Sequence, residues 1–182
     1  MGIYESEARL EDRMIEQLEK QGYQKVVIDD VNSLEDNFRK QLNKHNLIEL
    51  KGKELSDKEF ERLMVKISGK GVFQSAKELR QKQDIQRDDG SIVYLELFNT
   101  KEWCKNIFQV THQTTVEGKY TNRYDVTILI NGLPLVQIEL KRRGMDMKEA
   151  FNQIKRYKRH SYSGLYKFIQ LFVISNGVET KY

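Results

Sequence analysis

The spacing of apolar residues divides the chain into a helical first part and a strand-rich second part. In the first part, apolar residues recur every three or four positions, which predicts helices at 6–21, 34–42, 56–69 and 71–81, with a short strand at 25–28. From about residue 84 the apolar runs become alternating or continuous. This predicts strands at 92–98, 107–115, 123–130, 135–141 and 168–175, and one helix at 145–160. The last strand is nearly all apolar, which is typical of a central, buried strand.

This order of elements predicts an α/β (α+β) fold, in which a mixed central β-sheet is flanked by helices. The 182 residues fit a single domain, with a helical part at 1–83 and a sheet core at 84–182. A lone cysteine, Cys104, excludes an internal disulfide and fits a reducing, cytoplasmic location. No apolar run is long enough to span a bilayer, so we expect no membrane partner.

Two of the expected strands carry charged residues among apolar ones. Asp125 opens one strand, and Glu139 and Lys141 lie two apart near the end of the next, where they share a face. Burying charge is costly unless the charge is paired or binds a metal. Two carboxylates and a nearby main-chain carbonyl, assigned to Leu140, suit Mg²⁺. The ammonium of Lys141 can orient or deprotonate a water bound to such an ion. A surface Glu–Lys pair is the simpler alternative, but it leaves Asp125 unexplained.

The loop between these strands decides whether Asp125 joins the face of Glu139. A strict two-residue turn at Asn131-Gly132 places Asp125 opposite Ile138, on the wrong face. A three-residue loop, or a bulge ending at Gly132, places it on the correct face. We therefore predict an odd-length loop or a bulge.

The first helix offers one more carboxylate. Glu11 lies near the middle of the apolar stripe of that helix, and an inward-facing glutamate needs a cation, a metal or water. Glu11 is therefore a candidate for the same site. The alternative is a carboxylate stabilised by the helix dipole, which suits Glu7 better than Glu11.

A basic segment follows the charged strand. Residues 141–160 include eight Lys or Arg and two Asp or Glu, a net charge of +6 in a chain of net charge +4. Such a segment is typical of a polyanion site, although a solvated helix face has the same composition. Within it, a Gln and a Tyr four residues apart can hydrogen-bond and stack on a nucleic acid, or simply pack. The candidate nucleic-acid contacts are Arg142, Arg143, Gln153, Arg156 and Tyr157.

Other catalytic chemistry is not indicated. The three histidines are isolated and lack metal-ligand spacing, and no phosphate-binding G-x-x-x-x-G-K-[ST] loop is present. We therefore expect this chain not to bind ATP.

The pattern Asp125-x13-Glu139-Leu140-Lys141 resembles the PD-(D/E)xK nuclease signature, with Tyr124 where that family often has Pro. The surrounding residues are more specific. The chain around this pattern resembles the N-terminal nuclease domain of the restriction (HsdR) subunit of type I restriction-modification enzymes. The resemblance lies in the early helix, the segments at 123–126 and 131–136, the Gln153-x3-Tyr157 motif and the closing segment at 172–177.

This resemblance implies roles for the candidate residues. Asp125 and Glu139 bind Mg²⁺, Lys141 is the catalytic lysine, and Gln153 and Tyr157 lie near the DNA. Family members also use a glutamate from the first helix, which favours Glu11. The implied activity is cleavage of double-stranded DNA in a complex with methyltransferase and specificity subunits. The resemblance also implies that this chain is a fragment of a longer subunit, and that ATP is bound only by motor domains of that subunit.

Three other functions are compatible with these residues. One is a catalytically silent DNA-binding or docking module, another is a stand-alone repair or recombination nuclease of the same fold, and the third is an α+β interaction domain with a basic face. The complete Asp-Glu-Lys set argues against the silent module, which has no reason to keep all three.

Overall fold

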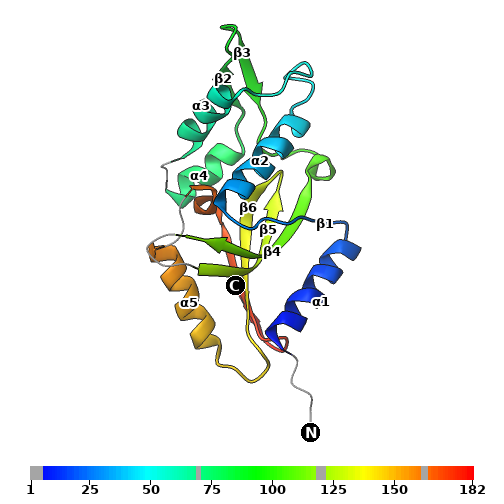
Figure 1. Cartoon of the computed structure of the whole chain (residues 1–182), viewed down its shortest axis with the longest axis vertical. Helices are drawn as coiled ribbons and strands as arrows, with labels where there is room; N and C mark the ends of the chain where they lie inside the picture. The colour runs from blue at the N-terminus through cyan, green and yellow to red at the C-terminus, as the bar shows by residue number, and fades with distance from the viewer. Residues whose placement is uncertain (1–5, 69–70, 118–121, 161–163) are drawn as a thin grey trace.

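In the computed structural model, a mixed six-stranded sheet runs through the centre of the molecule (Figure 1). The structure describes residues 6–68, 71–117, 122–160 and 164–182, without the side chains of 156–160. Neighbouring strands are antiparallel except for the pairs β1–β4 and β6–β7, which are parallel. The expected α/β class with a mixed sheet is therefore confirmed. In spatial order, the strands are β1 (Gln24–Lys25), β4 (Phe108–Val116), β5 (Asn122–Ile130), β6 (Leu133–Leu140), β7 (Leu171–Ser175) and β8 (Thr180–Lys181).

Two amphipathic helices, α1 (Glu7–Lys20) and α5 (Met147–His160), lie on opposite sides of this sheet (Figure 1). As expected, α1 ends just before Gly22, whose φ of 95° suits a helix-terminating glycine. The buried apolar contacts on the α1 side come from Leu10, Ile15, Val110, Val126, Ile138 and Leu140. Those on the α5 side come from Met147, Ala150, Ile154 and Ile174.

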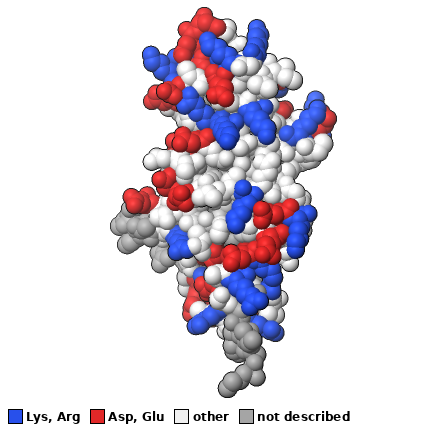
Figure 2. Space-filling view, turned by 45° about the vertical axis from the view of Figure 1, so that its right-hand side comes forward, with Lys and Arg blue, Asp and Glu red and all other residues white. Residues whose placement is uncertain are grey.

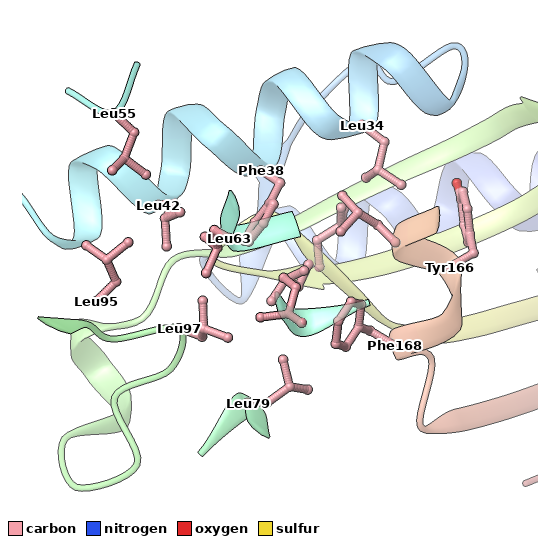
Figure 3. Packing of buried hydrophobic residues seen from close by; sticks show 14 of the residues in the cluster. Leu34, Phe38, Leu42, Leu55, Leu63, Leu79, Leu95, Leu97, Tyr166 and Phe168 are labelled. Atoms are coloured by element: carbon pink, nitrogen blue, oxygen red, sulfur yellow. The ribbon is translucent and has the colours of Figure 1, made fainter. Parts of the chain in front are cut away.

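The remaining helices gather at one end of the sheet, around the largest apolar core. Side chains from α2 point into this core together with Leu63 (Figure 3). Both α2 and α3 begin at capping boxes, and the box Ser56–Glu59 was expected from the sequence. These elements are α2 (Val31–His45), α3 (Asp57–Ile67), α4 (Val72–Leu79), the hairpin β2 (Gln83–Gln86) and β3 (Ile92–Leu95), and the 3-10 turns η1 (Trp103–Lys105) and η2 (Gly164–Phe168).

Three strand predictions differ from the structure. The apolar run at 168–175 starts at the last residue of the 3-10 turn η2, and only Leu171–Ser175 is a strand, in fifth rather than central position. The run at 92–98 belongs to a separate two-stranded sheet with β2. The strand expected at 25–28 is limited to Gln24–Lys25. As a result, the chain does not divide cleanly near residue 84, because α1 and β1 join the main sheet while β2 and β3 pack with the helices.

The β5–β6 hairpin contains both a tight turn and a bulge. Ile130 pairs with Leu133 across a two-residue turn, so the predicted odd-length loop is wrong. The turn residues Asn131 and Gly132 have φ of 50° and 83°, as tight hairpins require. A bulge follows at Leu135, where the register shifts by one residue. The predicted bulge is thus confirmed, although it lies beyond Gly132.

The bulge restores the register that the site needs. Beyond it, Ile128 pairs with Val136 and Val126 pairs with Ile138. One step further in this register, Asp125 lies opposite Glu139. The tight turn at Asn131-Gly132 therefore does not prevent the two carboxylates from meeting.

Candidate active site

Asp125 lies where β5 departs from regular pairing. Its neighbours Tyr124 and Val126 both pair with β4, but Asp125 itself is not part of either ladder of its strand. Its carboxylate instead accepts a hydrogen bond from the backbone N–H of Leu140, with N and Oδ2 2.7 Å apart. A side chain thus takes the place of a strand partner, and this contact fixes the Asp125 carboxylate against the end of β6.

Glu139 and Lys141 occupy the end of β6 beside it. Glu139 is completely buried, and Lys141 Nζ lies 3.7 Å from Glu139 Oε2. The Lys141 N–H donates to the carbonyl of Ser175 on β7, which holds the backbone of the lysine at the sheet. The structure therefore brings together Asp125, Glu139 and Lys141 from two adjacent strands.

The electrostatics of this cluster are dominated by burial. Desolvation raises the pKa of Asp125 above its usual value, because the charged form loses contact with water. The Leu140 N–H and the charge of Lys141 oppose this rise, the charge of Glu7 adds to it, and a hydrogen bond with the Glu139 carboxyl group again lowers the pKa. Asp125 is therefore held among charged groups in a place where its own charge is costly.

Glu11 reaches the same region from α1. It is only 5% exposed, and burial raises the pKa of its carboxyl group, as does the nearby charge of Asp125. The Gln113 side chain counteracts this rise, because its Nε2 donates to Glu11 Oε2 at 2.7 Å. His112 Nδ1 lies 3.9 Å from the same oxygen. The structure therefore confirms that Glu11 lies on the buried face of α1.

Two of these neighbours were not predicted from the sequence. Gln113 and His112 stand in a polar stretch of β4 that has no recognisable motif. Burial and the charge of Lys25 lower the pKa of His112, which favours its neutral form. Only the position of β4 under α1 reveals that both residues face Glu11.

The carboxyl groups suit an ion such as Mg²⁺, which needs few protein ligands, better than a structural metal ion, which needs three or more. The Asp125 and Glu139 carboxyl groups influence each other, and two neighbouring carboxylates are stabilised by a nearby cation. Mg²⁺ binds through one or two carboxylates and keeps several waters. Over the described ranges, no group of three or more His, Cys, Asp or Glu is arranged to hold a metal. The Leu140 carbonyl remains a predicted ligand.

The candidate DNA contacts follow directly after this cluster. Arg142 and Arg143 are exposed and line a small hollow between β6 and α5, and the Arg142 N–H donates to Glu7 Oε1 at 3.2 Å. Gln153 is half-buried on α5, whereas the side chains of Arg156 and Tyr157 lie outside the described residues.

The α1 side of the molecule carries a different charge pattern. Figure 2 shows acidic and basic side chains interspersed over the lower half of the face it presents. Among the described residues of that face, charges of both signs therefore offset one another, unlike the basic segment after Lys141.

Residues 4–182 match the family described as the type I restriction enzyme R protein N terminus (HSDR_N). The chain belongs to this family. It is 58% identical over 179 residues to the type I restriction enzyme SauMSSORF170P endonuclease subunit of Staphylococcus aureus (strain MSSA476), with 98% of this chain and 19% of that protein aligned. It is 40% identical over 185 residues to the type I restriction enzyme EcoprrI endonuclease subunit of Escherichia coli, with 98% of this chain and 58% of that protein aligned.

Membership of the HSDR_N family confirms the resemblance inferred from the motifs. The matched range includes α1 and the strands that carry Asp125, Glu139 and Lys141. The chain spans 19% of the length of the staphylococcal relative. Within the described ranges, no helix is both long and apolar enough to cross a membrane.

Proposed function

We propose that this chain is a Mg²⁺-dependent endonuclease module that hydrolyses phosphodiester bonds in double-stranded DNA. The observation that carries the proposal is the convergence of Asp125, Glu139 and Lys141 at the end of two adjacent strands. Family membership supports it, because the relatives are named as endonuclease subunits of type I restriction enzymes.

The residues of the cluster divide the work of hydrolysis. Asp125 and Glu139 would hold the ion, and the charge of Glu11 on the α1 side would add to its attraction. When bound, Mg²⁺ lowers the pKa of a coordinated water and stabilises negative charge on the phosphate. Lys141 orients the attacking water or takes its proton, and its ammonium form offsets charge on the reacting phosphate. The complete burial of Glu139 holds its carboxylate in place, with Oε2 3.7 Å from Lys141 Nζ.

The module acts as part of a larger assembly in this proposal. The basic residues Arg142, Arg143 and Arg156 contact the DNA backbone, and Gln153 and Tyr157 position the strand to be cut. Methyltransferase and specificity subunits select the DNA, and ATP-driven translocation belongs to parts of the R subunit outside this chain. The complex works in the cytoplasm, where cellular and foreign DNA are both accessible.

Metal binding is the first test. We expect isothermal calorimetry of the 182-residue chain to detect Mg²⁺, and Glu139→Gln to weaken that binding by at least about tenfold, because one of the two ligand charges is lost. Asp36→Asn, on an exposed part of α2, is the matched control and should bind as the unchanged chain does. Equal affinities for Glu139→Gln and the unchanged chain refute the metal site.

Cleavage is the second test, and it needs the complete R subunit with its partner subunits. Lys141→Ala should leave the fold and Mg²⁺ binding intact and lower the rate of DNA cleavage by about 100-fold or more, as loss of an acid–base residue does. The control is Lys148→Ala, which removes an exposed lysine of α5. Undiminished cleavage by Lys141→Ala contradicts its catalytic role, and a fully active complex with Asp125→Asn contradicts the proposed function.

A further inference from the structure

Strand β4 contains one residue in a conformation that strands avoid. Gln113 has a φ of 58°, in the left-handed region that is costly for residues other than glycine. It lies between two regular ladder pairs, His112 with Val126 and Thr114 with Tyr124. Such backbone strain persists only where the surrounding structure enforces it, and it gathers at functional sites.

The strain reverses the faces of the strands. Val110 and Val126 pack on the α1 side, whereas Val116 and Tyr124 pack in the large core. Residues an even number of positions apart normally share a face of a strand. The reversal therefore lies between them, at the level of Gln113 and Asp125, which is also the level where the ladder is interrupted.

The reversal has a chemical result. It directs the Gln113 amide at α1, where Nε2 donates to Glu11 Oε2 at 2.7 Å. Two groups of β4 face the buried Glu11 carboxylate, the Gln113 amide and His112 Nδ1. Without the amide, only His112 Nδ1 would remain of these two, at 3.9 Å from the carboxylate. Glu11 in turn lies close enough to Asp125 for the two charges to interact.

We propose that Gln113 is a positioning residue of the nuclease site. The left-handed backbone of Gln113 aims its amide at Glu11 and holds that carboxylate where its charge acts on Asp125 and can help to attract the same divalent cation. This role rests on the proposed function and extends it to a residue outside the Asp-Glu-Lys set. Outer partners that orient metal-binding carboxylates commonly affect metal affinity strongly.

Glycine provides a decisive substitution. Gln113→Gly fits the left-handed backbone and removes the amide, so the fold should be kept while the donor is lost. We expect its thermal midpoint to stay near that of the unchanged chain and its Mg²⁺ affinity, by calorimetry, to fall by about 10- to 100-fold. Glu11→Gln should weaken binding similarly, and the double variant Glu11→Gln/Gln113→Gly should bind no more weakly than Glu11→Gln alone.

The same strand offers a matched control. Gln109 is also a buried glutamine of β4, but its amide exchanges hydrogen bonds with Asn37 of α2, at 3.0 and 3.2 Å. Gln109→Met should lower the thermal midpoint and leave Mg²⁺ affinity unchanged. If Gln113→Gly binds Mg²⁺ as the unchanged chain does while Glu139→Gln loses binding, the positioning role is refuted and the nuclease proposal stands. If Mg²⁺ binds to none of these proteins, including the unchanged chain, both are refuted.

Discussion

Asp125 illustrates how one residue can serve a site at the expense of stability. Burial raises the pKa of its carboxyl group, so its charge is unfavourable in the folded chain without a cation. Asp125→Asn keeps an acceptor for the Leu140 N–H and removes that charge. We expect the metal-free variant to be more stable by about 0.5–2 kcal/mol, as is common when a functional group is neutralised.

Thermal unfolding in a chelator checks this prediction. In a chain of this length, 1 kcal/mol corresponds to about 2–4 °C in the midpoint. Asp36→Asn changes an exposed carboxylate of α2 and should shift the midpoint by less than about 2 °C. A lower midpoint for Asp125→Asn means that the charge is stabilising even without metal.

Tyr166 gives a prediction for alkaline pH. It is buried against the Tyr124 ring, and burial raises its pKa to about 12, an effect that the nearby Thr114 and Thr127 hydroxyls partly oppose. The folded chain therefore keeps this proton to a higher pH than the unfolded chain, whose tyrosines titrate near pH 10. Its contribution to stability is constant below pH 10 and is lost as pH rises towards 12.

The expected loss is about 3 kcal/mol, since each pKa unit corresponds to about 1.4 kcal/mol. Urea unfolding at pH 9 to 12 should show this loss in the unchanged chain but not in Tyr166→Phe. Taking the difference between the two proteins removes the effect of lysine titration, which both share. Parallel pH profiles for the two proteins would contradict a buried, neutral Tyr166.

At the level of single residues, the sequence was informative about chemistry and less so about geometry. Charge on an apolar strand was enough to select Asp125, Glu139 and Lys141, because burial penalises unpaired charge whatever the fold. Gln113 could not be selected in this way. A polar residue in a strand normally faces water, and only its left-handed backbone turns it towards Glu11.

At the level of elements, the β5–β6 turn is held by α2. Gly132 has a φ of 83°, and a Cβ added there would lie 2.6 Å from the Phe38 Cα on α2. Asn131 also anchors the turn, because its side chain accepts a hydrogen bond from the Ile107 N–H and donates one to the Leu97 carbonyl. The turn therefore links the strands of the site to the helical end of the molecule.

A pair of glycine substitutions separates backbone strain from this close contact. Gly90 has a similar φ of 85°, but no atom lies within 4 Å of its added Cβ. Gly90→Ala should cost about 1–2 kcal/mol for the left-handed backbone alone. Gly132→Ala should cost about 1–3 kcal/mol more, because the backbone of α2 must move. Chemical denaturation measures both, and equal losses would show that α2 adjusts freely.

The elements also show where prediction from hydrophobic patterns stops. Helix ends were well predicted where a recognised cap acts locally, as at Ser56 and Gly22. The helix expected at 34–42 instead runs over Val31–His45, because its cap at Asp30 was not recognised. The bulge at Leu135 depends on contacts between strands, so its presence could be inferred from the need to align Asp125 with Glu139 but its place could not. The apolar run that begins at Phe168 was extended too far, because a buried 3-10 turn is as apolar as a strand.

The largest apolar core and the exposed arginines of the β6–α5 connection lie at opposite ends of the molecule. The helices α2 to α4 and the large core lie at one end, whereas the connection from β6 to α5, with its exposed arginines, lies at the other (Figure 1). Phosphate contacts from a DNA duplex should therefore fall at the end that carries Arg142 and Arg143. Each contact releases counterions, so the slope of log K against log salt counts these contacts.

This arrangement predicts how surface arginines affect DNA binding. In chelator, to prevent cleavage, Arg142→Ala/Arg143→Ala should reduce the salt slope for a duplex oligonucleotide by about 2, at about 0.9 for each lost contact. The control is Lys53→Ala/Lys58→Ala, which removes the same charge from exposed positions at the α3 end. Fluorescence anisotropy between about 50 and 200 mM salt covers the range in which such slopes are steep. If both double variants flatten the slope equally, binding follows net charge, and the duplex does not dock at the end that carries Asp125, Glu139 and Lys141.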